Sequence, residues 1–121
     1  MRAALQDVAW SFVGEPFADR AAFEAELKQA QSSPATFEPG EIAILSPSIR
    51  VAYMCWEGDE QLHPVVSLTA QNGLAFTTGD LMFQLHDAVV ELLREIDHHF
   101  FEGLAFVEAG PPPLYRMRQG S

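Results

Sequence analysis

The sequence predicts one α+β domain spanning residues 1–121, with a mostly antiparallel sheet of five to six strands and two helices packed on one face. Three observations lead to this fold class. Several short segments alternate apolar and polar residues, two longer segments repeat apolar residues at helical spacing, and short turns separate consecutive strands. Sequential hairpins with inserted helices are typical of an antiparallel sheet. With 121 residues, 48% of them hydrophobic, the chain can bury a core without metals or disulfides.

The first predicted element is a strand over residues 5–13. Val8, Trp10 and Phe12 share one face there and alternate with smaller or polar residues. Such period-two alternation indicates a half-buried strand. Gly14-Glu15-Pro16 then interrupts the pattern.

A first helix is expected from Asp19, which can cap it, to about Gln31. Phe23, Leu27 and Ala30 stand at i, i+4 and i+7, which gives one apolar stripe along this helix. The Ser32-Ser33-Pro34 sequence should end it.

The middle of the chain reads as strands separated by turns. The expected strands are Ile42–Leu45, Ile49–Trp56, Leu62–Ala70 and a short return over Leu74–Phe76 after an Asn72-Gly73 hairpin turn. Ile49–Trp56 is apolar on both alternating faces, which is typical of a central strand or of one buried at a second interface. We therefore consider a homodimer through the sheet, which would cover an apolar face left open by the two helices.

The longest helical pattern begins at Thr77. Thr77 can cap the helix, with Asp80 near its positive end. The apolar stripe of this helix comprises Leu81, Leu85, Ala88, Val89, Leu92 and Ile96. Gly103 is the expected helix stop, and strands over Leu104–Glu108 and Leu114–Gln119 follow. We expect His86 to pack inside the domain.

The charge balance restricts the kinds of partner. The 17 acidic and 7 basic residues give a net charge of −10, which disfavours binding to nucleic acid and to anionic membranes. No apolar run approaches the roughly 18 residues of a membrane span. The single cysteine, Cys55, cannot form an internal disulfide, so a cytoplasmic location is expected.

Common catalytic and cofactor signatures are missing. The sequence has no GxGxxG, P-loop, GxSxG or CxxC motif, so we predict no cofactor and favour a non-enzymatic protein. Cys55 could act as a nucleophile with a histidine partner, but its place in an apolar strand favours an inert packing role.

The Asp97–Glu102 segment leaves two interpretations open. His98, His99 and Glu102 are candidate metal ligands, and His98 and Glu102 would share one face if the helix continued. On this interpretation the chain is a small metal-binding or hydrolytic domain. On the other interpretation, the histidines favour the negative end of the helix dipole and mark its end.

An acidic surface is the second candidate site. We predict partner-binding residues along the long helix and just after it, namely Asp87, Glu91, Glu95, Asp97 and Glu102. Glu91 and Glu95 are like charges at i,i+4, a mildly unfavourable arrangement that a cationic partner would relieve. An ordinary solvated helix face is the alternative.

The segment FTTGDLMFQLHDAVVELLREIDHHFFEGL, together with the terminal LYRMRQGS, resembles small acidic bacterial immunity-type proteins of polymorphic toxin systems. The resemblance covers roughly the C-terminal third and carries over no functional residue. It implies a compact cytosolic α+β domain that binds and blocks a toxin. The prediction is therefore a non-enzymatic immunity or inhibitor protein that neutralises a basic toxin through its acidic surface.

Overall fold

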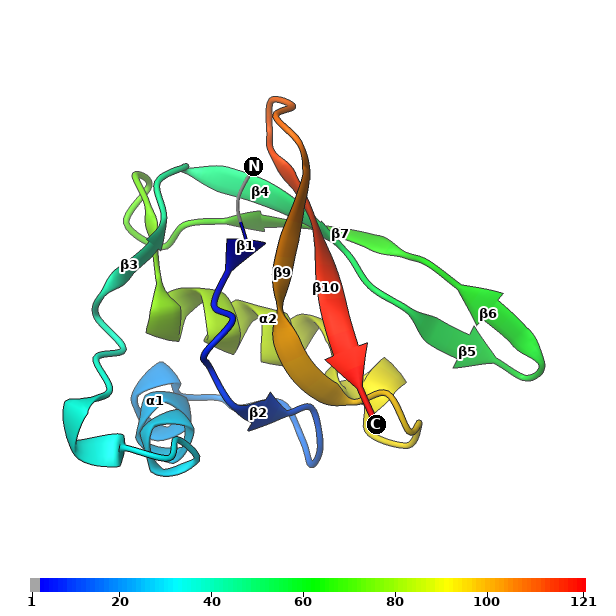
Figure 1. Ribbon diagram of the computed structural model, residues 1–121, viewed down its shortest axis with the longest axis horizontal. Helices are drawn as coiled ribbons and strands as arrows, with labels where there is room; N and C mark the ends of the chain where they lie inside the picture. The colour runs from blue at the N-terminus through cyan, green and yellow to red at the C-terminus, as the bar shows by residue number, and fades with distance from the viewer. Residues whose placement is uncertain (1–2) are drawn as a thin grey trace.

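The computed structural model describes residues 3–121 and shows an α+β fold built around one mixed sheet (Figure 1). The strand order is β1-β9-β10-β4-β7, and β2 also pairs with β9. The bounds of these strands are β1 Ala3–Ala4, β2 Trp10–Ser11, β4 Ser48–Ala52, β7 Val65–Thr69, β9 Phe100–Glu108 and β10 Leu114–Gly120. All neighbours are antiparallel except β10 and β4, which run parallel. The predicted fold class is confirmed.

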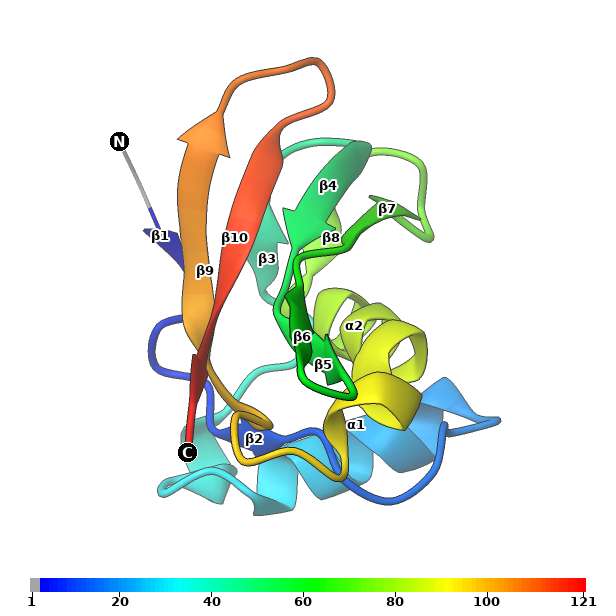
Figure 2. The ribbon, with the colours of Figure 1, turned by 90° about the vertical axis from the view of Figure 1, so that its right-hand side faces the viewer.

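Both helices lie on the same side of the sheet (Figure 2). Helix α2, Thr78–Leu93, covers the sheet, and α1, Arg20–Gln29, packs against α2. A short 3-10 helix, η1, Pro34–Thr36, follows α1. Phe23 and Leu27 of α1 are fully buried, as the predicted stripe requires.

The second helix begins as predicted but ends early. The Thr77 hydroxyl accepts a hydrogen bond from the Asp80 amide at 3.1 Å, and the helix ends at Leu93. The expected stop at Gly103 is wrong, because Gly103 lies inside β9 with a φ of +108°. A side chain there would press against the backbone of Gln6, with a Cβ only 3.2 Å from the Gln6 Cα. Pairing with the N-terminal segment, and not helix termination, requires this glycine.

The core lies between the sheet and the helices. Its largest fully buried side chains are Phe12, Phe23, Phe76, Leu27, Ile49, Leu81, Met82, Leu85, Leu93, Leu104, His86 and Val51. His86 is fully buried there, as expected. The Trp10 indole N–H donates a hydrogen bond to its Nδ1 at 3.1 Å. Its Nε2 therefore carries the proton and donates to the Glu15 carbonyl at 2.9 Å.

A long hairpin projects from the body of the molecule (Figure 1). Beyond β4 and β7 it continues as β5, Cys55–Glu57, and β6, Glu60–Leu62. The register is the same on both sides of the Tyr53–Pro64 pair, where the Tyr53 amide donates to the Pro64 carbonyl at 3.0 Å. Gly58, with a φ of +63°, begins the two-residue turn at the tip.

The predicted hairpin at Asn72-Gly73 does not form. The strand before this turn, β7, pairs with β4, whereas β8, Phe76–Thr77, pairs with β3, Ile42–Ile44. The Asn72 side chain closes the turn on itself by accepting from the Leu74 amide at 2.8 Å and the Ala75 amide at 3.0 Å. This local turn directs the chain out of the main sheet.

Within the described residues, no helix covers the second face of the sheet (Figure 2). Val65 on β7 and Val107 on β9 are exposed there, at 54% and 45%. The homodimer through the sheet remains a prediction.

Candidate partner-binding surface

Three of the predicted partner-binding residues lie together at the C-terminal end of α2. Glu91 is exposed in the last helical turn, and Glu95 and Asp97 are exposed in the connection to β9. We call these three residues the acidic end. The arginine that lies among them in sequence, Arg94, is occupied, because it pairs with Glu15 at 3.1 Å and donates to the Gly14 carbonyl at 3.0 Å.

The other two predicted residues are placed differently. Asp87 is half-buried and accepts a hydrogen bond from the Phe17 amide at 2.9 Å, so one of its oxygens holds the segment before α1. Glu102 is exposed on β9, and its carboxylate lies over Gly120 where an added Cβ would collide with it.

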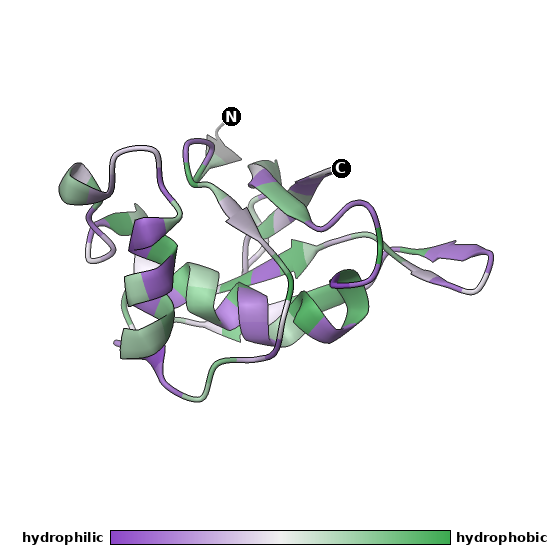
Figure 3. Cartoon of the chain, turned by 90° about the horizontal axis from the view of Figure 1, so that it is seen from below, coloured by the Kyte–Doolittle hydropathy of each residue, from purple (hydrophilic) through white to green (hydrophobic). Residues whose placement is uncertain are grey.

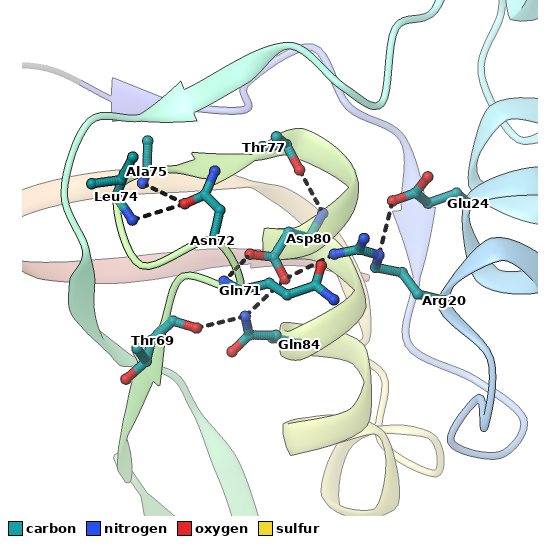
Figure 4. A network of polar contacts seen from close by, with 10 residues as sticks. All are labelled: Arg20, Glu24, Thr69, Gln71, Asn72, Leu74, Ala75, Thr77, Asp80 and Gln84. Atoms are coloured by element: carbon teal, nitrogen blue, oxygen red, sulfur yellow. Dashed lines mark hydrogen bonds and ion pairs between the residues drawn. The ribbon is translucent and has the colours of Figure 1, made fainter.

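Asp80, the acidic residue in the first turn of α2, is only 4% exposed. Figure 4 shows its polar contacts. Its Oδ2 accepts from the Gln71 amide at 3.0 Å, and its Oδ1 accepts from the Gln84 side chain at 2.9 Å. Arg20 of α1 forms an ion pair with the same carboxylate at 3.7 Å. Asp80 therefore joins α1, α2 and the segment after β7, and it does not belong to the exposed acidic surface.

The tip of the β5–β6 hairpin adds three exposed carboxylates, those of Glu57, Asp59 and Glu60. We call them the acidic tip; it is coloured hydrophilic in Figure 3. Trp56, beside the tip, is 45% exposed. Sequence reasoning treated this segment only as a polar turn, although Gly58-Asp59 is a residue pair typical of a two-residue hairpin turn.

A single glutamine connects the base of this hairpin to the acidic end. The Gln119 side chain accepts from the Met54 amide at 2.7 Å and donates to the Met54 carbonyl at 3.0 Å. It also donates to the His98 carbonyl at 2.9 Å. Because His98 follows Asp97, the hairpin base and the acidic end are neighbours, and both lie toward the same end of the molecule (Figures 1 and 3).

The ion pairs of the described residues leave both groups of carboxylates without a cationic partner. Across residues 3–121, the arginine ion pairs involve Glu15, Glu24, Asp80 and Glu108, and none involves the acidic end or the acidic tip. Within these residues, no ion pair neutralises either group of carboxylates.

The candidate metal ligands do not converge. Because α2 ends at Leu93, the condition under which His98 and Glu102 would share one helical face is not met. His98 is exposed, whereas His99 is half-buried and its Nδ1 bonds the Ile96 carbonyl. Within residues 3–121, no group of three or more His, Cys, Asp or Glu side chains could hold a metal ion.

Cys55 lies in the core at 2% exposure. Burial raises the pKa of its thiol, and the nearby charge of Glu57 raises it further. A raised pKa keeps the sulfur protonated at neutral pH, whereas nucleophilic cysteines need a lowered one. This geometry favours the packing role.

An open groove of about 850 Å³ lies between α1, β2 and the start of β9. We call it the β2 groove. Its lining residues are Ala9, Trp10, Ser11, Val13, Phe17, Glu26, Gln29, Ala30, Phe100, Phe101, Glu102 and Ser121. Most of this lining is apolar. Glu102 is the only lining residue that the sequence analysis named as a candidate site residue.

Comparison of the chain with family models, curated proteins and solved structures gives no match. No helix within residues 3–121 has both the length and the apolar character needed to cross a membrane.

Proposed function

We propose that this chain is a non-enzymatic protein inhibitor of the immunity class, which binds a basic partner, such as a toxin, through its acidic surface. The observation that carries the proposal is that the acidic end and the acidic tip are exposed and take part in no ion pair within residues 3–121, while Gln119 joins the base of the tip's hairpin to the acidic end. These exposed carboxylates come from segments far apart in the sequence.

Electrostatics gives this arrangement a physical rationale. Carboxylates held close together repel one another. A basic partner surface would be attracted to them and would offset this repulsion. Long-range attraction also speeds the encounter, and added salt screens it. The exposed Trp56 beside the acidic tip supplies an aromatic side chain of the type that often anchors protein interfaces.

The test is capture of the partner from the native host at low salt, followed by affinity measurements with the purified partner. Glu57→Gln/Asp59→Asn/Glu60→Gln and Glu91→Gln/Glu95→Gln/Asp97→Asn should each weaken binding about tenfold or more, and salt should weaken wild-type binding. A matched control removes three exposed carboxylates elsewhere, at Asp7, Glu38 and Glu41. If no basic partner is captured, or if the control weakens binding as much as the two site variants, the proposal fails.

The alternative, a metal-binding or hydrolytic domain using Asp97–Glu102, gains no support from the geometry, because His98, His99 and Glu102 are not assembled. An inhibitor of the proposed kind would act in the cytoplasm, where the buried Cys55 would stay a thiol. A gene for a large secreted toxin directly upstream would be expected for this class.

A further inference from the structure

We propose that the β2 groove receives an apolar segment of the protein partner that carries an arginine or lysine side chain. This inference rests on the proposed function and adds a second, chemically different contact to it. The groove is lined by apolar surface and carboxylates, whereas the acidic end and acidic tip act mainly through charge.

The groove exposes large apolar side chains to solvent. Phe100 is 42% exposed and Val13 is 46% exposed, and the half-buried rings of Trp10 and Phe17 lie in the same lining. Covering such a surface with aliphatic or aromatic groups removes apolar area from water, which is favourable. The lining therefore fits an apolar segment.

The Trp10 ring in the lining of the groove is held in place before anything binds. The Trp10 ring packs edge-on against Phe23, with centroids 4.9 Å apart, and its indole N–H is held by the buried His86. A preformed apolar site loses little conformational entropy on binding.

The edge of β2 does not offer free backbone groups at Ala9. The Gln31 side chain accepts from the Ala9 amide at 2.9 Å and donates to the Ala9 carbonyl at 2.9 Å. A partner strand that paired here would have to displace Gln31. Recognition by inserted side chains is therefore favoured over addition of a strand.

Charge then specifies the inserted side chain. Glu26 of α1 and Glu102 of β9 both line the groove, and no lysine, arginine or histidine does. A guanidinium or ammonium group would meet these carboxylates while its aliphatic stem lies on the aromatic lining, where cation–π contact adds to the attraction. An acidic segment would meet only repulsion.

Selection of a random peptide library against the full chain tests the inference without assuming a ligand sequence. Trp56→Phe leaves Trp10 as the remaining tryptophan, so fluorescence of Trp10 reports on the groove. The peptides that change this fluorescence should be enriched in arginine or lysine beside apolar residues.

Variants then identify the groups responsible. Glu26→Gln/Glu102→Gln should weaken the peptides about tenfold or more, whereas the matched Glu38→Gln/Glu41→Gln, at exposed carboxylates outside the groove, should change affinity less than about twofold. Gly120→Ala, which displaces the Glu102 carboxylate without changing charge, should also weaken binding. Urea unfolding of each variant checks that it is folded.

Three results would overturn the inference: no peptide that reports through Trp10, selected peptides without cationic residues, or equal loss in both double variants. Affinity measurements with the captured partner distinguish this inference from the proposed function. If Glu26→Gln/Glu102→Gln leaves partner affinity unchanged while the acidic-tip variant lowers it, the groove inference fails and the proposed function stands.

Discussion

The side-chain amide of Gln31 pairs with the peptide group of Ala9 in both directions, as a neighbouring strand would. The Ala9 amide donates to Oε1 and Nε2 donates to the Ala9 carbonyl, each at 2.9 Å. Nε2 also donates to the Leu27 carbonyl at 2.7 Å, which ties the N-terminal segment to the end of α1. Gln119 and Met54 repeat the same two-way pairing at the other side of the fold.

Replacing Gln31 by alanine should therefore lower the free energy of unfolding by about 2 kcal/mol, because it leaves partly buried backbone groups unpaired. Urea unfolding followed by circular dichroism measures the change. Gln29→Ala, at an exposed glutamine in the last turn of α1, is the control and should change stability by less than about 0.5 kcal/mol. Equal effects of the two substitutions would contradict a structural role for the Gln31–Ala9 pair.

Asp80→Ala should cost about 3 kcal/mol of stability. It removes a buried acceptor for the Gln71 amide and the Gln84 side chain, and it leaves Arg20 without this carboxylate. Thr77→Ala, which removes only the helix cap, should cost about 1 kcal/mol. Thermal or urea unfolding should show a larger loss of stability for these two variants than for Glu91→Ala, which removes an exposed carboxylate on the same helix. If Asp80→Ala matches Glu91→Ala, the network in Figure 4 does not stabilise the fold.

His86 should be neutral with its proton on Nε2. The indole of Trp10 can only donate, so Nδ1 must accept, and Nε2 is left to donate to the Glu15 carbonyl. Long-range nitrogen–proton NMR correlation distinguishes the two tautomers directly, and a protonated Nδ1 would refute the arrangement. Trp10→Phe removes the donor and should cost about 2 kcal/mol, whereas the exposed Trp56→Phe should be nearly neutral.

Stability should decline at alkaline pH because of two buried acids on the inner face of the long hairpin. Burial raises the pKa of Tyr53 above its ordinary value of 10.0, with a smaller contribution from Cys55. The pKa of Cys55 is raised from 9.0. Since the folded pKa values exceed the unfolded ones, the folded state binds more protons, and stability falls as pH rises above about 9.

Unfolding curves collected between neutral and alkaline pH measure this decline. Tyr53→Phe removes one titrating group and should flatten the upper part of the pH dependence, whatever its effect on stability at neutral pH. A pH profile with the same slope in wild type and in a Tyr53→Phe/Cys55→Ala variant would contradict the assignment.

Self-association through the outer sheet face gives a further prediction. Val65 and Val107 are exposed on the face that carries no helix, and burial of this face between two copies would remove them from water. Sedimentation velocity at micromolar concentration should then show a dimer that Val107→Asp converts to a monomer. A wild-type monomer under these conditions would exclude the sheet interface.

The fold class was predictable because it depends on local patterns. Phe23 and Leu27 define one helix, and the Thr77 cap marks the start of the other. The end of α2 was not predictable in the same way. The helical pattern continues through Ile96, but Phe100 and Phe101 pair with β2, and this non-local pairing fixes where the strand begins.

The candidate surface was predictable only in part, for the same reason. Glu91, Glu95 and Asp97 are close in sequence, so a sequence pattern can group them. The base of the hairpin that carries the acidic tip is joined to them only through Gln119, which belongs to a distant strand. Likewise, the β2 groove combines residues from the first and last parts of the chain, and no local pattern indicates that Trp10, Glu26 and Glu102 line one surface.

The place of β10 in the sheet has a consequence for how the chain reaches its folded state. This strand follows all the others in the sequence, yet it lies between β9 and β4 and is the link in the sheet between the β1–β2–β9 group and the β4–β7 hairpin. During synthesis on the ribosome, the hairpin can form early from local contacts, but the two groups cannot join until Leu114–Gly120 has emerged. Until then the β4 edge of the hairpin lacks its neighbouring strand, and the net negative charge of the chain opposes association of that edge with other copies.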